Sequence, residues 1–225
     1  MKNWKRKTAA LLLMMLLLTG CGAEKETAPE DETAPQEETQ APEETAPQGN
    51  ESTLWLPEGT ALQMAETEHL PELAALIAET CGIPEEEWGG TRYYYTYVDL
   101  NDDGTQEILA VAMGMYTSGS GGDSALLVQP AAGMSLTQKF TLVRMPILIS
   151  DQTTGGAHDL ILLRGGGGSE PAFVRLTCTD GIYSNPADAE VLESLEGITG
   201  KAVLCNDVVA ELDSGTALTL AGPRQ

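Results

Sequence analysis

The 225-residue chain has few cationic residues, and this shortage limits its partners. It contains 12 Lys and Arg against 34 Asp and Glu, which gives a formal net charge of −22. Residues 54–225 hold only seven of the cations and 24 of the acids, a net charge of −17. Binding to nucleic acid depends on clustered Lys and Arg that neutralise phosphates. The sequence therefore excludes nucleic acid as a direct partner.

Histidine is scarcer still, with only His69 and His158 in the whole sequence. Neither lies near a Cys or Ser that an imidazole could activate, and no His/Cys group has the spacing of a zinc site. The glycine run 165–168 lacks the Lys-Ser/Thr of a phosphate-binding P-loop and reads as a turn. The sequence therefore indicates no catalytic residues, and whether the protein is an enzyme stays open.

The N-terminal apolar run Ala9–Leu18 is too short to cross a bilayer, which takes about 20 residues. It follows the basic segment Met1–Lys7 and precedes small residues, an order typical of a secretory signal. Leu18-Thr19-Gly20-Cys21 then resembles a bacterial lipobox. The resemblance implies cleavage before Cys21 and diacylation, of the palmitate type, on its thiol.

We therefore expect residues 1–20 to be a lipoprotein signal peptide, and the mature protein to be lipid-anchored on the extracytoplasmic face of a bacterial cell membrane. Two acyl chains are enough, because each buried methylene contributes about 0.8 kcal/mol and one chain alone holds only marginally. The alternative is a soluble secreted protein with an incidental cysteine at the cleavage site.

Residues 21–53 are expected to form a disordered tether behind the lipidated Cys21. The motif Glu-Thr-Ala-Pro recurs there, with ten acidic residues and no apolar periodicity, so nothing offsets the entropy cost of ordering. At about 3.1 Å per residue, thirty such residues reach at most about 90 Å. The alternative is that the repeats are themselves a ligand.

Residues 54–225 are predicted to form one mainly β (α+β) domain. An apolar stripe after Pro71, ended by Gly82, predicts an amphipathic helix over 70–81. Short Val/Ile/Leu/Tyr runs between turn residues predict strands near 91–98, 107–113, 124–129, 136–144, 147–150, 159–164, 172–177 and 201–209, with a weak helix near 187–196. We expect an antiparallel sheet or sandwich with the N-terminal helix packed on one face.

The segment from Asp99 to Glu107 has oxygen-bearing side chains at alternate positions and a glycine at the sixth. This spacing can fold six oxygens around one hard cation, which favours calcium over magnesium. The predicted ligands are Asp99, Asn101, Asp103, the Thr105 carbonyl and a bidentate Glu107. The calcium would be structural. The alternative is an ordinary Asx/Gly turn with solvated acids.

This loop, with a strand on each side, resembles the calcium loops of FG-GAP and VCBS repeats, which lead directly into an apolar strand as Glu107–Val111 does here. The resemblance covers about 92–140 and implies that Asp99, Asn101, Asp103 and Glu107 are side-chain ligands. The loop itself departs from the EF-hand pattern. Its twelfth position, counted from Asp99, is Ala110, and a strand follows it where an EF-hand requires a helix.

Two segments of the chain resemble each other when they are aligned at an offset of 52 residues. This alignment pairs Glu107 with Asp159 and Asp99 with Asp151. This predicts two blade-like β units, about 92–141 and 144–183. In the second unit Thr153 and Gly155 replace two ligands, so we expect it not to bind calcium. Two blades cannot close a propeller, which takes about four.

Cysteine is rare, and three of the four lie in the folded domain. A Cys178–Cys205 disulfide would close a loop of about 28 residues and stabilise by about 3–4 kcal/mol. The alternative is three unpaired thiols, Cys81 included, acting as small apolar side chains.

Two classes of function remain open at this point. The first is a surface-anchored binding module for an unknown envelope glycan or protein, with Tyr93, Tyr95 and Tyr97 as a possible ligand face. The second is an envelope enzyme or enzyme inhibitor that acts through carboxylates on a cell-wall glycan. A concave pocket joining acids to those tyrosines would favour the second class.

Overall fold

The computed structural model describes residues 51–166 and 168–222. The predicted signal peptide, the predicted lipidation site Cys21 and residues 21–50 of the predicted tether lie outside these residues. Glu51–Thr53, predicted as the disordered end of the tether, form a 3₁₀ turn instead. No helix among the described residues is long and apolar enough to cross a membrane.

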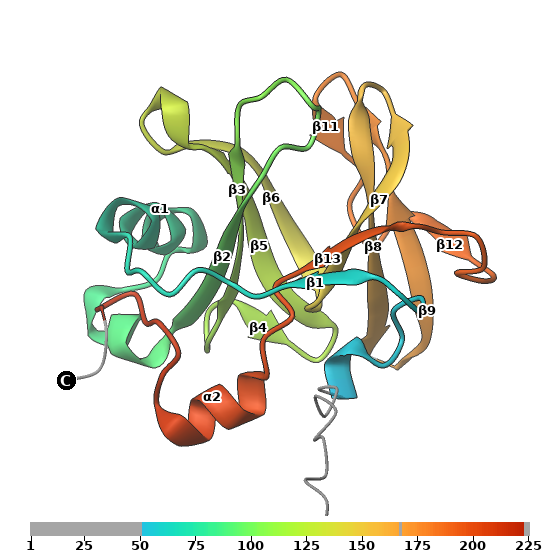
Figure 1. The fold of residues 1–225 in the computed structure, drawn as a ribbon. Coiled ribbons are helices and arrows are strands. Elements are labelled where there is room, and N and C mark those ends of the chain that lie inside the picture. The colour runs from blue at the N-terminus through green and yellow to red at the C-terminus, as the bar shows by residue number, and fades with distance from the viewer. Residues whose placement is uncertain (1–50, 167, 223–225) are drawn as a thin grey trace, which may run out of the picture. The chain divides into compact units, whose positions relative to one another are not determined.

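Two β-sheets pack face to face (Figure 1). Sheet I contains β2 Arg92–Val98, β3 Glu107–Met113, β4 Ser118–Gly119, β5 Gly122–Gln129 and β6 Ser135–Val143. Sheet II has the order β1 Ala61–Gln63, β13 Gly200–Val203, β7 Ile147–Thr154, β8 Ala157–Gly166, β9 Ser169–Leu176 and β12 Glu190–Leu192. All pairings are antiparallel except β1 with β13. The expected mainly β fold with antiparallel sheets is confirmed.

Helices are few and short. The described residues form two α-helices, α1 Pro71–Cys81 and α2 Val208–Ser214, and three 3₁₀ turns, η1 Glu51–Thr53, η2 Glu85–Gly90 and η3 Pro130–Ala132. A small antiparallel ribbon, β10 Cys178–Thr179 with β11 Ile182–Tyr183, stands apart from both sheets. Helix α1 ends at Gly82, which adopts the left-handed conformation that glycine reaches without steric cost.

The main hydrophobic core lies between the two sheets. Sheet I contributes Leu109, Val111 and Phe140, and sheet II contributes Leu160 and Val174, all at most 2% exposed. Alternate residues of each strand point to this core, as the period of two in a strand requires. The remaining residues of each strand face away from this core, so their apolar side chains are shielded from solvent only where another element packs on the outer face of the sheet.

A second core lies between the outer face of sheet I and helix α1. Leu73 and Ile77 of α1 pack there on Tyr93, Tyr95 and neighbouring strand residues. Both tyrosine side chains are buried, with 0% and 1% exposure. The expected ligand face of Tyr93, Tyr95 and Tyr97 is therefore wrong for the first two, because helix α1 covers the face of β2 on which they lie. Tyr97 is half-buried.

Two sequence-based element predictions near the C-terminus are wrong. The strand expected over 201–209 ends at Val203, because Asp207 accepts a hydrogen bond from Ala210 N and begins α2. The helix expected near 187–196 is absent from this described stretch, which instead holds β12, paired with β9. Edge pairing with sheet II overrides the weak helical pattern there.

Of the two alternatives for the cysteines, the structure has the free thiols: Cys81, Cys178 and Cys205 are all unpaired, and no Cys178–Cys205 disulfide joins the last two. Cys178 packs in the core between the sheets, whereas Cys205 packs in a third cluster with Leu148 and Ile161. The two sulfurs therefore belong to different cores. Both act as small apolar side chains, and burial raises the pKa of the Cys205 thiol.

Candidate metal centre

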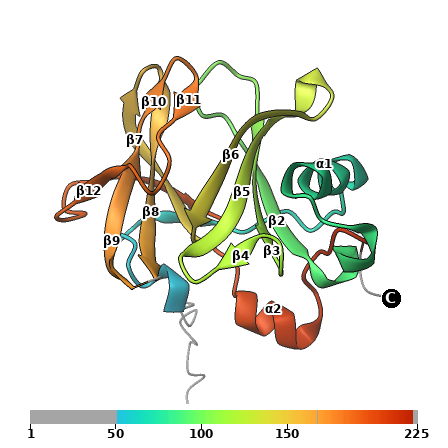
Figure 2. The same cartoon turned by 180° about the vertical axis from the view of Figure 1, so that it is seen from behind.

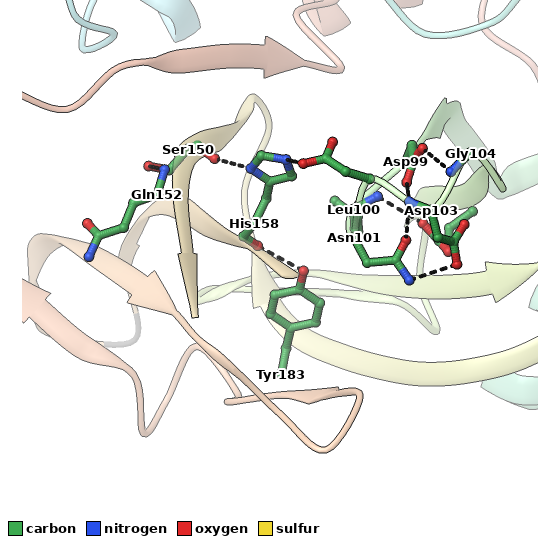
Figure 3. Close-up of polar contacts among 11 residues, drawn as sticks. Asp99, Leu100, Asn101, Asp103, Gly104, Ser150, Gln152, His158 and Tyr183 are labelled. Carbon is green, nitrogen blue, oxygen red and sulfur yellow. Dashed lines mark hydrogen bonds and ion pairs between the residues drawn. The ribbon is translucent and has the colours of Figure 1, made fainter. Parts of the chain in front are cut away.

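The predicted metal loop joins β2 to β3 at one end of the sandwich (Figure 1). The Asp99 carboxylate folds back over the loop and accepts hydrogen bonds from Gly104 N at 2.8 Å and from Asp103 N at 3.2 Å (Figure 3). Gly104 has a φ of 82°, a conformation that glycine reaches at no steric cost. The loop amides thus hold the first predicted ligand in place without any ion.

Asn101 and Asp103 lie in the same turn. Asn101 Nδ2 donates to Asp103 Oδ2 at 3.0 Å, and Thr105 N donates to Asp103 Oδ1 at 2.7 Å. The Thr105 amide, together with Asn101, lowers the pKa of the Asp103 carboxyl group below its ordinary value. The structure therefore brings together three of the predicted side-chain ligands, of which Asn101 and Asp103 are exposed and Asp99 is half-buried.

Glu107 is oriented differently from the other three. Its carboxylate is buried, with 7% of the residue exposed. Oε2 accepts from Leu100 N at 3.0 Å, and Oε1 accepts from Gln129 Nε2 at 3.3 Å. Within residues 51–166 and 168–222, no three His, Cys, Asp or Glu side chains are grouped as metal ligands. The side-chain oxygens of Asp99, Asn101 and Asp103 accept hydrogen bonds within the loop, whereas the Glu107 carboxylate accepts from Leu100 N and Gln129 Nε2.

His158 ties the loop to sheet II, a contact that the sequence did not predict. Its backbone N–H donates to Leu100 O at 2.7 Å, and its ring Nε2 lies 3.1 Å from Asp102 Oδ2. Ring Nδ1 lies 2.7 Å from Ser150 O, which can only accept, so Nδ1 carries a proton (Figure 3). The pairing with Asp102 is then an ion pair when Nε2 is also protonated. The side-chain pattern gave no signal for it, because His158 lies 56 residues beyond Asp102.

The segment that the sequence aligns with this loop, 151–159, forms a tight hairpin between β7 and β8. Asp151 lies within β7, and Thr153 pairs with His158 across the turn. Gly155 and Gly156 form that turn with φ values of 61° and 86°, which suits a two-residue hairpin turn. The Asp151 carboxylate accepts instead from Thr199 Oγ1 at 2.6 Å. The expectation that this segment does not bind calcium stays a prediction.

A small cavity of about 250 Å³ lies beside the metal loop. Glu107 and Gln129 line one part of it, and Tyr183 and Cys178 line another. Burial raises the pKa of the Tyr183 hydroxyl, and the nearby Cys178 and Glu107 raise it further. This hydroxyl donates to His158 O at 2.8 Å, so it supports the hairpin that contacts the loop.

No protein-family model, no curated protein and no solved structure matches this chain.

Proposed function

We propose that this protein is a bacterial lipoprotein that presents a β-rich binding module on the extracytoplasmic side of the cell membrane. The lipobox-like segment ending at Cys21 supports the anchor, and the acidic, proline-rich residues 22–53 support a tether. The single observation on which the module's proposal rests is the turn in which Asp99, Asn101 and Asp103 are held together by loop amides.

In this proposal the 99–107 loop binds one structural calcium ion. Asp99, Asn101 and Asp103 supply side-chain oxygens, Thr105 supplies its carbonyl, and Glu107 joins when its carboxylate leaves Gln129. Asp99, Asp103 and Glu107 repel one another in a domain with a net charge of −17, so a cation also removes an electrostatic cost. The bound ion would order the end of the sandwich where His158 meets the loop.

The resemblance to FG-GAP and VCBS repeats enters the proposal as a pair of related β units. In support, β2, β3, β5 and β6 pair in chain order within sheet I, and β7, β8 and β9 pair in chain order within sheet II. The aligned residues Glu107 and Asp159 are both buried carboxylates, with 7% and 1% exposure. We propose one unit with a metal loop and one whose loop has shortened to a hairpin.

Calcium should stabilise the protein modestly. With about 1 mM calcium and a dissociation constant of about 10⁻⁴ M, mass action raises the free energy of unfolding by about 1.4 kcal/mol. Urea denaturation of the full chain in non-ionic detergent, followed by tryptophan fluorescence, measures the difference between calcium and EDTA. Asp103→Ala should abolish this difference.

Asp151→Ala is the matched control, because it removes an acid at the equivalent position of the second unit. The calcium-dependent increment should persist in this variant, even if losing the bond to Thr199 changes the baseline stability. If the wild-type chain unfolds identically in calcium and in EDTA, the calcium proposal is wrong and the loop is an ordinary acidic turn.

The tether proposal predicts the order of proteolysis. Residues 22–53 should be cut first, because an extended chain without a core is open to a protease. The resistant fragment should begin near Leu54, as N-terminal sequencing would show. A protected fragment that retains the Glu-Thr-Ala-Pro repeats would contradict the tether.

The partner in this proposal is an envelope glycan or protein. Capture of glycans and proteins from an envelope extract by the immobilised full chain, with and without EDTA, would find it. Retention of one ligand only in the presence of calcium would link the partner to the 99–107 end of the module. Equal retention by wild type and Asp103→Ala would place the partner elsewhere.

A further inference from the structure

A second and larger cavity lies at the opposite end of the sandwich from the metal loop. It has a volume of about 610 Å³ and lies among η1, the start of β5, the end of β6 and the start of α2. Figures 1 and 2 show α2 and β4 at this end, with the β2–β3 loop at the other. The volume falls in the range of about 300–1,000 Å³ that small-molecule sites occupy.

Most of the cavity wall is apolar. Trp55, Met113, Met145 and Leu163 contribute from four different segments of the chain. The Trp55 ring is braced by Phe173, with the ring centroids 5.3 Å apart. Val209 of α2 also lines the cavity and remains 69% exposed, which places an apolar side chain at its rim. Such a wall suits a ligand with large apolar groups.

Arg144 provides a fixed positive charge in this cavity. Its Nε and Nη2 both donate to Gly165 O, at 3.2 Å and 3.0 Å, and Nη2 also donates to Ser120 O at 3.0 Å. These bonds use one edge of the guanidinium and leave its Nη1 to donate elsewhere. Because the acceptors are uncharged carbonyls, they do not neutralise the cation.

Asp123 provides the opposite charge. It is half-buried, and burial raises the pKa of its carboxyl group, although a hydrogen bond from Ser118 and the charge of Arg144 partly oppose that rise. Among the salt bridges of the described residues, none joins Asp123 to Arg144, although both line the cavity. A second carboxylate, Asp207, also lines the cavity, where its Oδ1 accepts from Ala210 N at the start of α2. Arg144 and Asp123 thus face the same cavity without a direct ion pair between them.

We infer that this cavity binds a zwitterionic short peptide, of about dipeptide size, with apolar side chains. The ligand's carboxylate would pair with Arg144 and its ammonium group with Asp123, while its side chains would cover the apolar wall. A purely anionic ligand would enter against the domain's net charge of −17, and a purely cationic one would leave Arg144 unmatched. The inference does not depend on calcium, because the metal loop lies at the other end.

Calorimetric titration of the full chain in nanodiscs of zwitterionic lipid tests this, with Leu-Leu as the probe and EDTA present. Two derivatives separate the charges: Leu-Leu amide lacks the carboxylate, and N-acetyl-Leu-Leu lacks the ammonium group. Each should bind at least about tenfold more weakly than Leu-Leu, since a hydrogen bond to a charged group contributes about 1.5–3 kcal/mol. No binding of Leu-Leu at millimolar concentration, or equal binding of either derivative, would overturn the inference.

Asp123→Asn locates the site. It should weaken Leu-Leu binding at least about tenfold by removing the partner of the ammonium group. Glu86→Gln is the matched control, because this exposed residue of η2 does not line the cavity, and it should leave the affinity unchanged. Urea denaturation of each variant shows whether it is folded. Undiminished binding of Leu-Leu to folded Asp123→Asn would place the ligand elsewhere.

Discussion

Cys21→Ser should release the protein from the membrane fraction into the soluble fraction. Serine lacks the thiol on which the proposed diacyl group is formed, and the remaining acidic tether and domain have no other proposed attachment. Two acyl chains bind a membrane far more tightly than one, so the expected change is close to complete. Fractionation of cells that express either form, followed by immunoblotting, measures the distribution.

Metabolic labelling with a fatty-acid precursor provides the second readout. The wild-type chain should incorporate the label, and Cys21→Ser should not. A Ser52→Ala variant, changed at the far end of the proposed tether, should label and fractionate like the wild type. If the wild type lacks label while Cys21→Ser remains membrane-bound, the lipoprotein proposal is wrong.

Tyr93→Ala should destabilise the domain by about 3–5 kcal/mol, the usual cost of removing a large aromatic side chain from a core. The Tyr93 ring is 0% exposed and packs between sheet I and helix α1. Its hydroxyl also accepts from Leu70 N at 3.0 Å and contacts His69 Nδ1 at 3.0 Å, so it fixes the chain at the start of α1. Urea denaturation measures the loss.

Tyr116→Ala is the control for this prediction. Tyr116 lies in the loop between β3 and β4 and is 47% exposed, so its removal should change the free energy of unfolding by about 0.5 kcal/mol or less. Equal effects of the two substitutions would contradict the burial of Tyr93 beneath α1. They would also reopen the idea of a tyrosine face that binds a ligand.

The longer strands of both sheets, β2, β3 and β5 to β9, could be predicted from local sequence. Runs such as 107–113 combine β-branched and aliphatic residues with flanking turn residues, and β3 has these same bounds. Helix α1 spans Pro71–Cys81, where an apolar stripe falls between Pro71 and Gly82. In these segments the local propensity and the tertiary packing favour the same structure.

The sequence-based predictions are wrong where contacts between distant segments determine the burial of a strand or the type of an element. The tyrosines of β2 read as a half-exposed strand, but a helix and a second sheet bury both of its faces, and local sequence does not show which faces gain cover. The end of β13 could have been found, because Asn206-Asp207 before Val208 is a helix N-cap signal. The three-residue edge strand β12, which pairs with β9, is too short to leave a pattern from which it could be predicted.

In the candidate site, too, the features set by local sequence could be predicted and those set by contacts between distant segments could not. The spacing of Asp99, Asn101 and Asp103 indicated a turn that gathers oxygens, because the glycine and the alternate polar residues specify it locally. The burial of Glu107 against Gln129 and the contact of His158 with the loop join segments far apart in the chain. The cavity with Asp123 and Arg144 is lined by residues from six separate segments, so no local motif predicts it.

Direct calcium titration tests the central claim that the 99–107 loop is a cation site. Isothermal calorimetry of calcium into the full chain, in non-ionic detergent, should show one ion per chain with a dissociation constant of about 10⁻⁴–10⁻³ M. Asp103→Ala should lose this binding, and Asp151→Ala should retain it. Calcium binding that is absent from the wild type, or equal in wild type and Asp103→Ala, would contradict the account.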